Sequence, residues 1–197
     1  GISLVDLIVS PVPQLSGDES HIICLNSSIP LLLTPGVNPA DFSAFTYLWS
    51  TGETTPTVQV SSPGIFTVTV TNNFGCSSVK TITLTASDAA TIEEVLVEDL
   101  TGPNRIEIVV SGAGDYEFAL DFAQGPYQDS AVFNDVLSGF HTVFVRDKNG
   151  CGITSAEVAV LGIPKFFTPN GDGFNDTWQL RGLPPELVPG TKIYIFD

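Results

Sequence analysis

The feature that most constrains the fold of this chain is an internal repeat without gaps. Residues 64–76 (GIFTVTVTNNFGC) and 139–151 (GFHTVFVRDKNGC) align one to one at an offset of 75 residues. In each copy a turn glycine precedes apolar residues at every second position, and a polar turn then ends in Gly-Cys. Such alternation is typical of a half-buried β-strand, and a second alternating stretch follows each cysteine. The repeat therefore predicts two copies of one β module, each ending on a hairpin.

The repeat also sets the limits of the two modules. We expect the first over residues 1–87 and the second over residues 88–162, with the joint at residues 87–90. No flexible Gly/Ser stretch separates the modules. A spacer of only a few residues leaves little independent motion, so we expect a semi-rigid rod.

The composition points to β-structure along the whole chain. It includes 18 glycines and 14 prolines but no Met, and only seven Lys and Arg residues. This balance favours many short strands joined by turns. In the second module, residues 105–110 and 116–121 alternate on either side of the turn segment 111–114, which predicts one further hairpin.

The charge of the chain excludes one class of partner. Acidic residues outnumber basic ones by 22 to 7, and the formal net charge is -15. A field of that sign repels phosphate backbones and anionic lipid headgroups, so we expect no nucleic acid partner. No apolar run approaches the roughly 18 residues of a membrane helix, so we expect no transmembrane segment. The first residues lack the pattern of a signal peptide, so we expect any export signal to lie upstream or to have been removed.

The three cysteines allow three disulfide pairings. We expect Cys24 to pair with Cys76, because both lie in the first module, and Trp49 lies between them. This Cys-Trp-Cys order resembles the immunoglobulin β-sandwich, in which a buried Trp packs on the bridge between the sheets. The bridge implies an oxidising compartment. Cys151 takes the place of Cys76 in the repeat, but Asp99 stands where Cys24 would have its counterpart, so we expect Cys151 to be unpaired.

Catalytic chemistry finds no support in the sequence, and we predict that the chain is not an enzyme. Only His21 and His141 could titrate near neutral pH. His141 takes the register position of Phe66 on the inward side of a strand, which indicates packing, and we expect His21 to be exposed. The sequence contains no strained nucleophile turn, paired-histidine metal motif or phosphate-binding loop.

The sharpest local motif is residues 164–178, PKFFTPNGDGFNDTW. Asn170, Asp172 and Asp176 could offer oxygen ligands on a loop that its glycines let curl, as oxygen-rich loops do around Ca²⁺. Asn-Gly and Asp-Gly are also the favoured dipeptides of tight turns, whose side chains bond their own backbone. Both interpretations stay open, with the plain turn favoured, and no cofactor is required.

The same motif resembles the start of the gliding-motility-associated C-terminal domain, the type B sorting domain of Bacteroidetes type IX secretion. The residues that carry this resemblance are Pro169, Asn170, Gly171, Asp172, Gly173, Asn175, Asp176 and Trp178. Lys192–Asp197 resembles the next strand of that family. The second module resembles the SprB-type repeat of large gliding adhesins, and the first resembles PKD-like or immunoglobulin-like surface repeats. The resemblance implies export by the type IX outer-membrane machinery and attachment at the cell surface.

We therefore predict an all-β chain of tandem immunoglobulin-like β-sandwiches, followed at residues 163–197 by the first strands of a truncated third β domain. The predicted function is that of the non-catalytic C-terminal region of a type IX-secreted protein, extracellular or on the outer-membrane surface. Its modules would act as stalk or adhesin repeats, and its end as an export and anchoring signal. Two alternatives stay open. The modules could be accessories of a large secreted polysaccharide-degrading enzyme, or one could bind surface polysaccharide through Tyr47, Tyr127 or Trp178.

Overall fold

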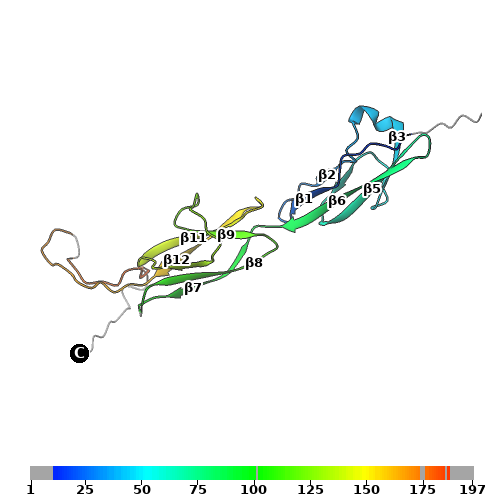
Figure 1. Cartoon of the computed structure of the whole chain (residues 1–197). Helices are drawn as coiled ribbons and strands as arrows, with labels where there is room; N and C mark the ends of the chain where they lie inside the picture. Colours follow the sequence, from blue (N-terminus) through cyan, green and yellow to red (C-terminus); the bar gives the residue numbers. More distant parts are fainter. Residues whose placement is uncertain (1–10, 101, 174–175, 185, 187–197) are drawn as a thin grey trace, which may run out of the picture. The chain divides into compact units, whose positions relative to one another are not determined.

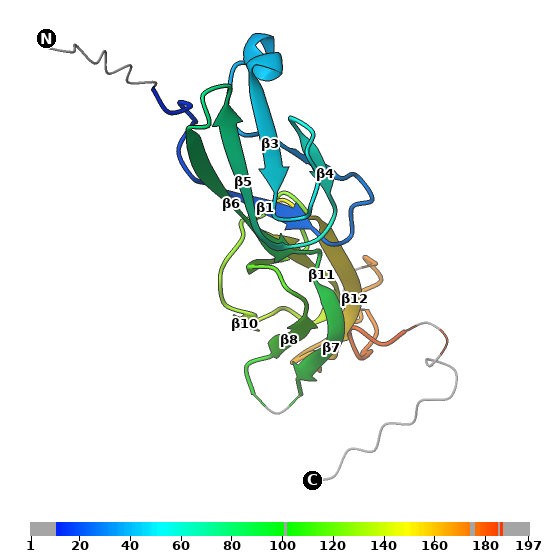
Figure 2. The same cartoon turned by 90° about the vertical axis from the view of Figure 1, so that its right-hand side faces the viewer.

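The computed structural model describes residues 11–100, 102–173, 176–184 and 186. The chain divides into two compact units, unit 1 and unit 2, with the boundary between Ser87 and Asp88 (Figures 1 and 2). Both units consist of β-strands, and unit 1 also contains the short 3-10 helix η1 (Pro39–Ala44) between β2 and β3. The predicted all-β class of tandem immunoglobulin-like sandwiches is confirmed.

Unit 1 packs a four-stranded sheet on a two-stranded one. The larger sheet has the order β1-β6-β5-β3, and the smaller pairs β2 with β4. The strands are β1 (Glu19–Cys24), β2 (Leu31–Leu33), β3 (Phe45–Trp49), β4 (Val58–Val60), β5 (Gly64–Asn72) and β6 (Ser77–Ser87). β1 runs parallel to β6, whereas the other pairs are antiparallel.

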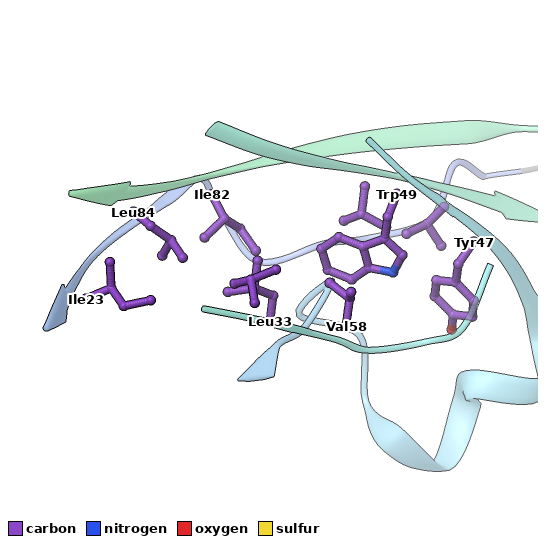
Figure 3. Close-up of a cluster of buried hydrophobic side chains, with 10 residues drawn as sticks. Ile23, Leu33, Tyr47, Trp49, Val58, Ile82 and Leu84 are labelled. Atoms are coloured by element: carbon purple, nitrogen blue, oxygen red, sulfur yellow. The ribbon is translucent and has the colours of Figure 1, made fainter. Parts of the chain in front are cut away.

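The core of unit 1 is built around Trp49 (Figure 3). The predicted alternation holds on β5, where Val68 is completely buried. Leu33 of β2 and Val58 of β4 belong to the same core as Trp49 of β3, so the indole joins the two sheets. Its Nε1 donates a hydrogen bond of 2.9 Å to the carbonyl oxygen of Thr55, which satisfies the one polar atom of the ring.

A lysine lies in this apolar setting. Lys80 occupies the core side of β6, and its side chain has no exposed surface. Its Nζ donates to Glu19 Oε1 at 2.6 Å, to Ser16 Oγ at 2.8 Å and to the carbonyl oxygen of Thr34 at 3.3 Å. Three acceptors match the three protons of an ammonium group. The hydrogen bond from Lys80 is the main reason that the pKa of Glu19 falls to about 2.

Unit 2 packs two three-stranded sheets, ordered β10-β8-β7 and β12-β11-β9. Its strands are β7 (Thr91–Glu98), β8 (Arg105–Ser111), β9 (Tyr116–Leu120), β10 (Val132–Asn134), β11 (Gly139–Asp147) and β12 (Ile153–Val160). β11 and β12 form the hairpin that the repeat predicts. Val143 and Val145 of β11 are completely buried, as are the equivalent valines of β5.

The hairpin predicted from residues 105–110 and 116–121 is wrong. Both segments are strands, but β8 pairs with β7 and β10, whereas β9 pairs with β11 in the other sheet. The turn between them is held by Asp88 Oδ1, which accepts from the Ala113 amide at 2.7 Å and from the Tyr116 hydroxyl at 2.6 Å. Alternation identifies a half-buried strand, but it does not identify the strand's partner.

The chain beyond β12 forms a loop that returns to the end of that strand. Gly162 and Arg181 make an isolated antiparallel bridge, with backbone hydrogen bonds of 3.1 and 2.9 Å. Gly182 follows with a φ of +73°, and a Cβ at this position would lie 2.2 Å from the carbonyl oxygen of Val160. The predicted strand at Lys192–Asp197 lies outside the described residues.

Candidate functional sites

Asp176 organises the turn at the centre of the sorting-like motif. Its Oδ1 accepts from the amide of Gly171 and its Oδ2 from the amide of Gly173, both at 2.7 Å. These bonds lower the pKa of Asp176 below its usual value. The two glycines have φ values of +75° and +86°, a region that other residues rarely adopt. Asn170 Nδ2 donates to Asp172 Oδ2 at 2.8 Å, so the side chains of the motif bond within the turn itself.

Trp178 closes the base of the same loop. Its Nε1 donates to the carbonyl oxygen of Pro164 at 3.0 Å, and its ring is half-buried. Pro169 precedes the turn and is exposed, whereas Asn175 lies outside the described residues. Among the residues described, no three His, Cys, Asp or Glu side chains are grouped so that they could hold a metal ion. Ca²⁺ at Asn170, Asp172 and Asp176 therefore stays a prediction.

The predicted Cys24–Cys76 bridge is wrong. Cys24 lies opposite Ser87 at the end of β6, whereas Cys76 immediately precedes the start of that strand. The 11 residues of β6, at about 3.3 Å each, separate the two cysteines by roughly 30 Å, and a disulfide needs Cα atoms within about 7 Å. The disulfide-bonded cysteines are Cys24 and Cys151, so the prediction that Cys151 is unpaired is wrong as well.

Both histidines have structural roles. His21 is exposed, as predicted, and its Nε2 lies 3.1 Å from Glu19 Oε2. His141 is largely buried, and its Nδ1 lies 2.9 Å from Asp121 Oδ2. Its Nε2 lies 2.7 Å from the carbonyl oxygen of Leu137. Because both ring nitrogens of His141 lie within hydrogen-bond distance of Asp121 and Leu137, neither is positioned to take a proton from a substrate.

Two of the aromatic residues proposed as sugar platforms, Tyr47 and Tyr127, are buried or covered by other side chains. Tyr47 is 5% exposed and donates its hydroxyl to the carbonyl oxygen of Phe42. The ring of Tyr127 carries the Arg146 guanidinium 3.9 Å from its centroid, in a cation–π contact. An open groove of about 550 Å³ lies in unit 1 instead, between the Pro11–Gln14 segment and the turn after β5. It is lined in part by Phe74, which is 76% exposed.

The outer face of the larger sheet of unit 1 has an unusual composition for so acidic a chain. Apart from Cys24 at the end of β1, its outward positions on β1, β3, β5 and β6 carry hydroxyl-bearing and aliphatic residues, and we call this surface the uncharged face. It comprises Ser20, Ile22, Thr46, Leu48, Ile65, Thr67, Thr69, Thr71, Ser77, Val79, Thr81, Thr83 and Thr85. Leu48, Thr69 and Val79 form its central row across β3, β5 and β6. The alternate threonines of β5 and β6 are visible in the sequence and indicate part of this face. The sequence does not show the pairing that brings these two strands together with β3 and β1.

Comparison with known proteins gives no family. No protein family model and no curated protein matches the chain. Similar solved structures include the N-terminal four Ig domains of Dscam1 isoform 6.44, at 16% identity and a TM-score of 0.42, over 79% of this chain and 47% of that one. The N-terminal eight Ig domains of DSCAM match at 14% identity and a TM-score of 0.45, over 83% of this chain and 29% of that one. Murine CEACAM1b matches at 9% identity and a TM-score of 0.45, over 73% and 98% of the two chains.

The chain thus spans less than half the length of the first two of these structures. Within the residues that the structure describes, no helix is long and apolar enough to cross a membrane.

Proposed function

We propose that the two units are stalk or adhesion modules of an extracellular surface protein and carry no catalytic role. We further propose that residues 164 onward belong to a type B sorting signal, which directs export through the type IX machinery and attachment at the cell surface. The first proposal rests on the joint between the units, and the second on the sorting-like motif.

At the joint, the last residue of unit 1 and the first residue of unit 2 are both fixed by hydrogen bonds. Ser87 is completely buried, and its carbonyl oxygen accepts from the Leu25 amide of unit 1 at 2.8 Å. The next residue, Asp88, is already bonded within unit 2 to Ala113 and Tyr116. Residues 87 and 88 are thus each hydrogen-bonded within their own unit, and no flexible linker stands between them, as a stalk requires.

An extracellular location is supported by the disulfide-bonded Cys24 and Cys151. Disulfides persist in oxidising compartments and are rare in the reducing cytosol. The absence of a predicted catalytic motif and the engaged nitrogens of His141 favour binding by surface over chemistry.

Export is tested by fusing a reporter to the complete terminal domain in a Bacteroidetes host. We expect scrambling of residues 164–178 to keep the reporter inside the cell. Asp176→Ala should lower export, because it releases the amides of Gly171 and Gly173, whereas Thr177→Ala on the neighbouring exposed residue should not. A reporter that still reaches the surface after scrambling would disprove the sorting role.

A carbohydrate-binding role is the second candidate, and the groove beside Phe74 is the observation that favours it. An exposed aromatic ring next to the amides of Asn38 and Asn73 could hold a sugar by stacking and hydrogen bonds. A glycan array with the intact chain and with Phe74→Ala tests this role. Phe122→Ala, which removes another exposed ring from unit 2, is the matched control. Signals lost with Phe74→Ala alone would support it, and a silent array would exclude it.

A further inference from the structure

The uncharged face is open as well as uncharged. Leu48 is 56% exposed, Val79 is 62% exposed and Ile65 is 70% exposed. Large aliphatic side chains that share one sheet face, rather than being scattered singly, mark an interaction surface. Their neighbours are threonines, which add methyl groups and hydroxyls but no charge.

Unit 2 shows that the fold does not impose such a face. The repeat and the strand registers make Phe144 the counterpart of Thr69, and Ser155 the counterpart of Val79. Next to Phe144 on the same face, Arg146 pairs with Glu117 at 2.6 Å and lies over the ring of Tyr127. The same sheet of a related sandwich therefore accepts charges and a covering aromatic ring.

We infer that unit 1 binds a second copy of this chain, face to face, through the uncharged face. Two copies of a chain with a net charge of -15 repel each other wherever their carboxylates meet. The strand residues of the uncharged face bring no like charges together; the Asp18 carboxylate, which accepts from the Thr81 amide at 2.8 Å, lies at its border. Each threonine hydroxyl is both donor and acceptor, so identical faces are complementary to each other, as a twofold interface requires. Two sheets would then pack about 10 Å apart, as they do inside a sandwich.

The inference concerns unit 1 alone and does not depend on the proposed export signal. Sedimentation velocity of the 197-residue chain, at concentrations up to about 1 mM, should show reversible self-association that strengthens as salt screens the net charge. Val79→Glu and Val79→Lys should each raise the dissociation constant at least about tenfold, because both place a charge inside the contact. Ser155→Glu makes a matched charge change on the face of unit 2 and should leave the constant unchanged.

Val79→Lys separates a specific contact from a general charge effect. It makes the chain less negative, so repulsion alone would predict stronger association, whereas the proposed contact predicts weaker association. A chain that stays monomeric, a stronger association with Val79→Lys, or an equal effect of Ser155→Glu would each overturn the inference. Binding of a neutral polysaccharide by a monomeric chain, lost with Val79→Glu, would assign the face to a glycan instead. If a Val79 variant unfolds, Leu48→Lys tests the same row from β3.

Discussion

The two units end alike but begin differently. Each closes on a hairpin formed by its copy of the repeat, β5–β6 in unit 1 and β11–β12 in unit 2. Among the described residues of unit 1, the first strand, β1, joins that hairpin in parallel with β6. The first strand of unit 2, β7, instead pairs antiparallel with β8 in the opposite sheet. A duplicated hairpin therefore does not dictate which sheet the first strand joins.

Lys80 provides a physical reason for the difference. Its counterpart in the register of unit 2 is Ala156, because Lys80 pairs with Val68 and Ala156 with the equivalent Val143. A buried ammonium group needs an anion, and Glu19 at the start of β1 supplies it. Ala156 carries no charge and needs no anion, so unit 2 has no equivalent ion pair that would place β7 beside β12.

The largest expected effect comes from breaking the pair that holds β1 to β6. Glu19→Ala leaves the Lys80 ammonium buried without its anion, and we expect it to destabilise unit 1 by about 3 kcal/mol. This is the lower end for buried pairs, because the Glu19 side chain is 38% exposed. Hydrogen exchange of the β6 amides measures the change.

Glu98→Ala on β7 is the control for this prediction. Its pair with Arg105 is exposed, so the change in unit 2 should stay below about 0.5 kcal/mol. Equal losses in the two units would contradict the anchoring role of Lys80.

The same pair makes the stability of unit 1 depend on pH. The pKa of Glu19 is about 2 when folded, against an ordinary value of 4.5. Because the folded pKa is the lower one, the stabilisation is fully present above pH 4.5 and is lost as the pH falls toward 2. Urea unfolding of the chain and of Glu19→Gln should therefore differ most above pH 5 and converge near pH 2. A constant difference across this range would exclude the Lys80–Glu19 pair as its cause.

The turns of the two closing hairpins differ in length by one residue, and a different side chain holds each of them. Asn72 in unit 1 accepts from the Cys76 amide with its side chain, and Asp147 accepts from the Cys151 amide in the same way. The turn of unit 2 is one residue longer, because Asp147 bonds the carbonyl oxygen of Gly152, whereas Asn72 bonds that of Cys76. Asp147 is also buried and accepts from the Asp115 amide.

We therefore expect Asp147→Ala to cost more than Asn72→Ala. Losing the buried acceptor orphans the amides of Cys151 and Asp115, at about 2 kcal/mol, whereas the partly buried turn of Asn72 should lose about 1 kcal/mol. Hydrogen exchange of β11 and of β5 measures the two values separately. A larger loss for Asn72→Ala would mean that burial does not set the strength of these turns.

The smallest expected effect concerns Ca²⁺ at the Asn170–Asp176 loop. Since both Asp176 oxygens already accept backbone amides, we expect thermal melts with Ca²⁺ and with EDTA to coincide. A higher melting temperature with Ca²⁺, abolished by Asp172→Asn, would support the metal site instead.

Local patterns in the sequence predicted the strands well. The alternation in residues 64–70 and 139–145 correctly gave β5 and β11 and their buried valines. The same pattern correctly identified β8 and β9 as strands but paired them wrongly, because pairing depends on strands elsewhere in the chain. The Cys24–Cys76 pairing failed for a related reason. Both cysteines lie in the same module, but the length of β6 keeps them apart, and the sequence pattern does not give that separation.

The sequence by itself determined that this chain is a repeated, all-β, acidic protein, because alternation, turn residues and charge are local properties that survive without a partner. Only the tertiary structure decided which sheet each first strand joins, where Lys80 finds its anion, and how threonines from several strands meet on one uncharged face. These features depend on residues distant along the chain. Packing and hydrogen bonding bring such residues together only when the sandwich closes.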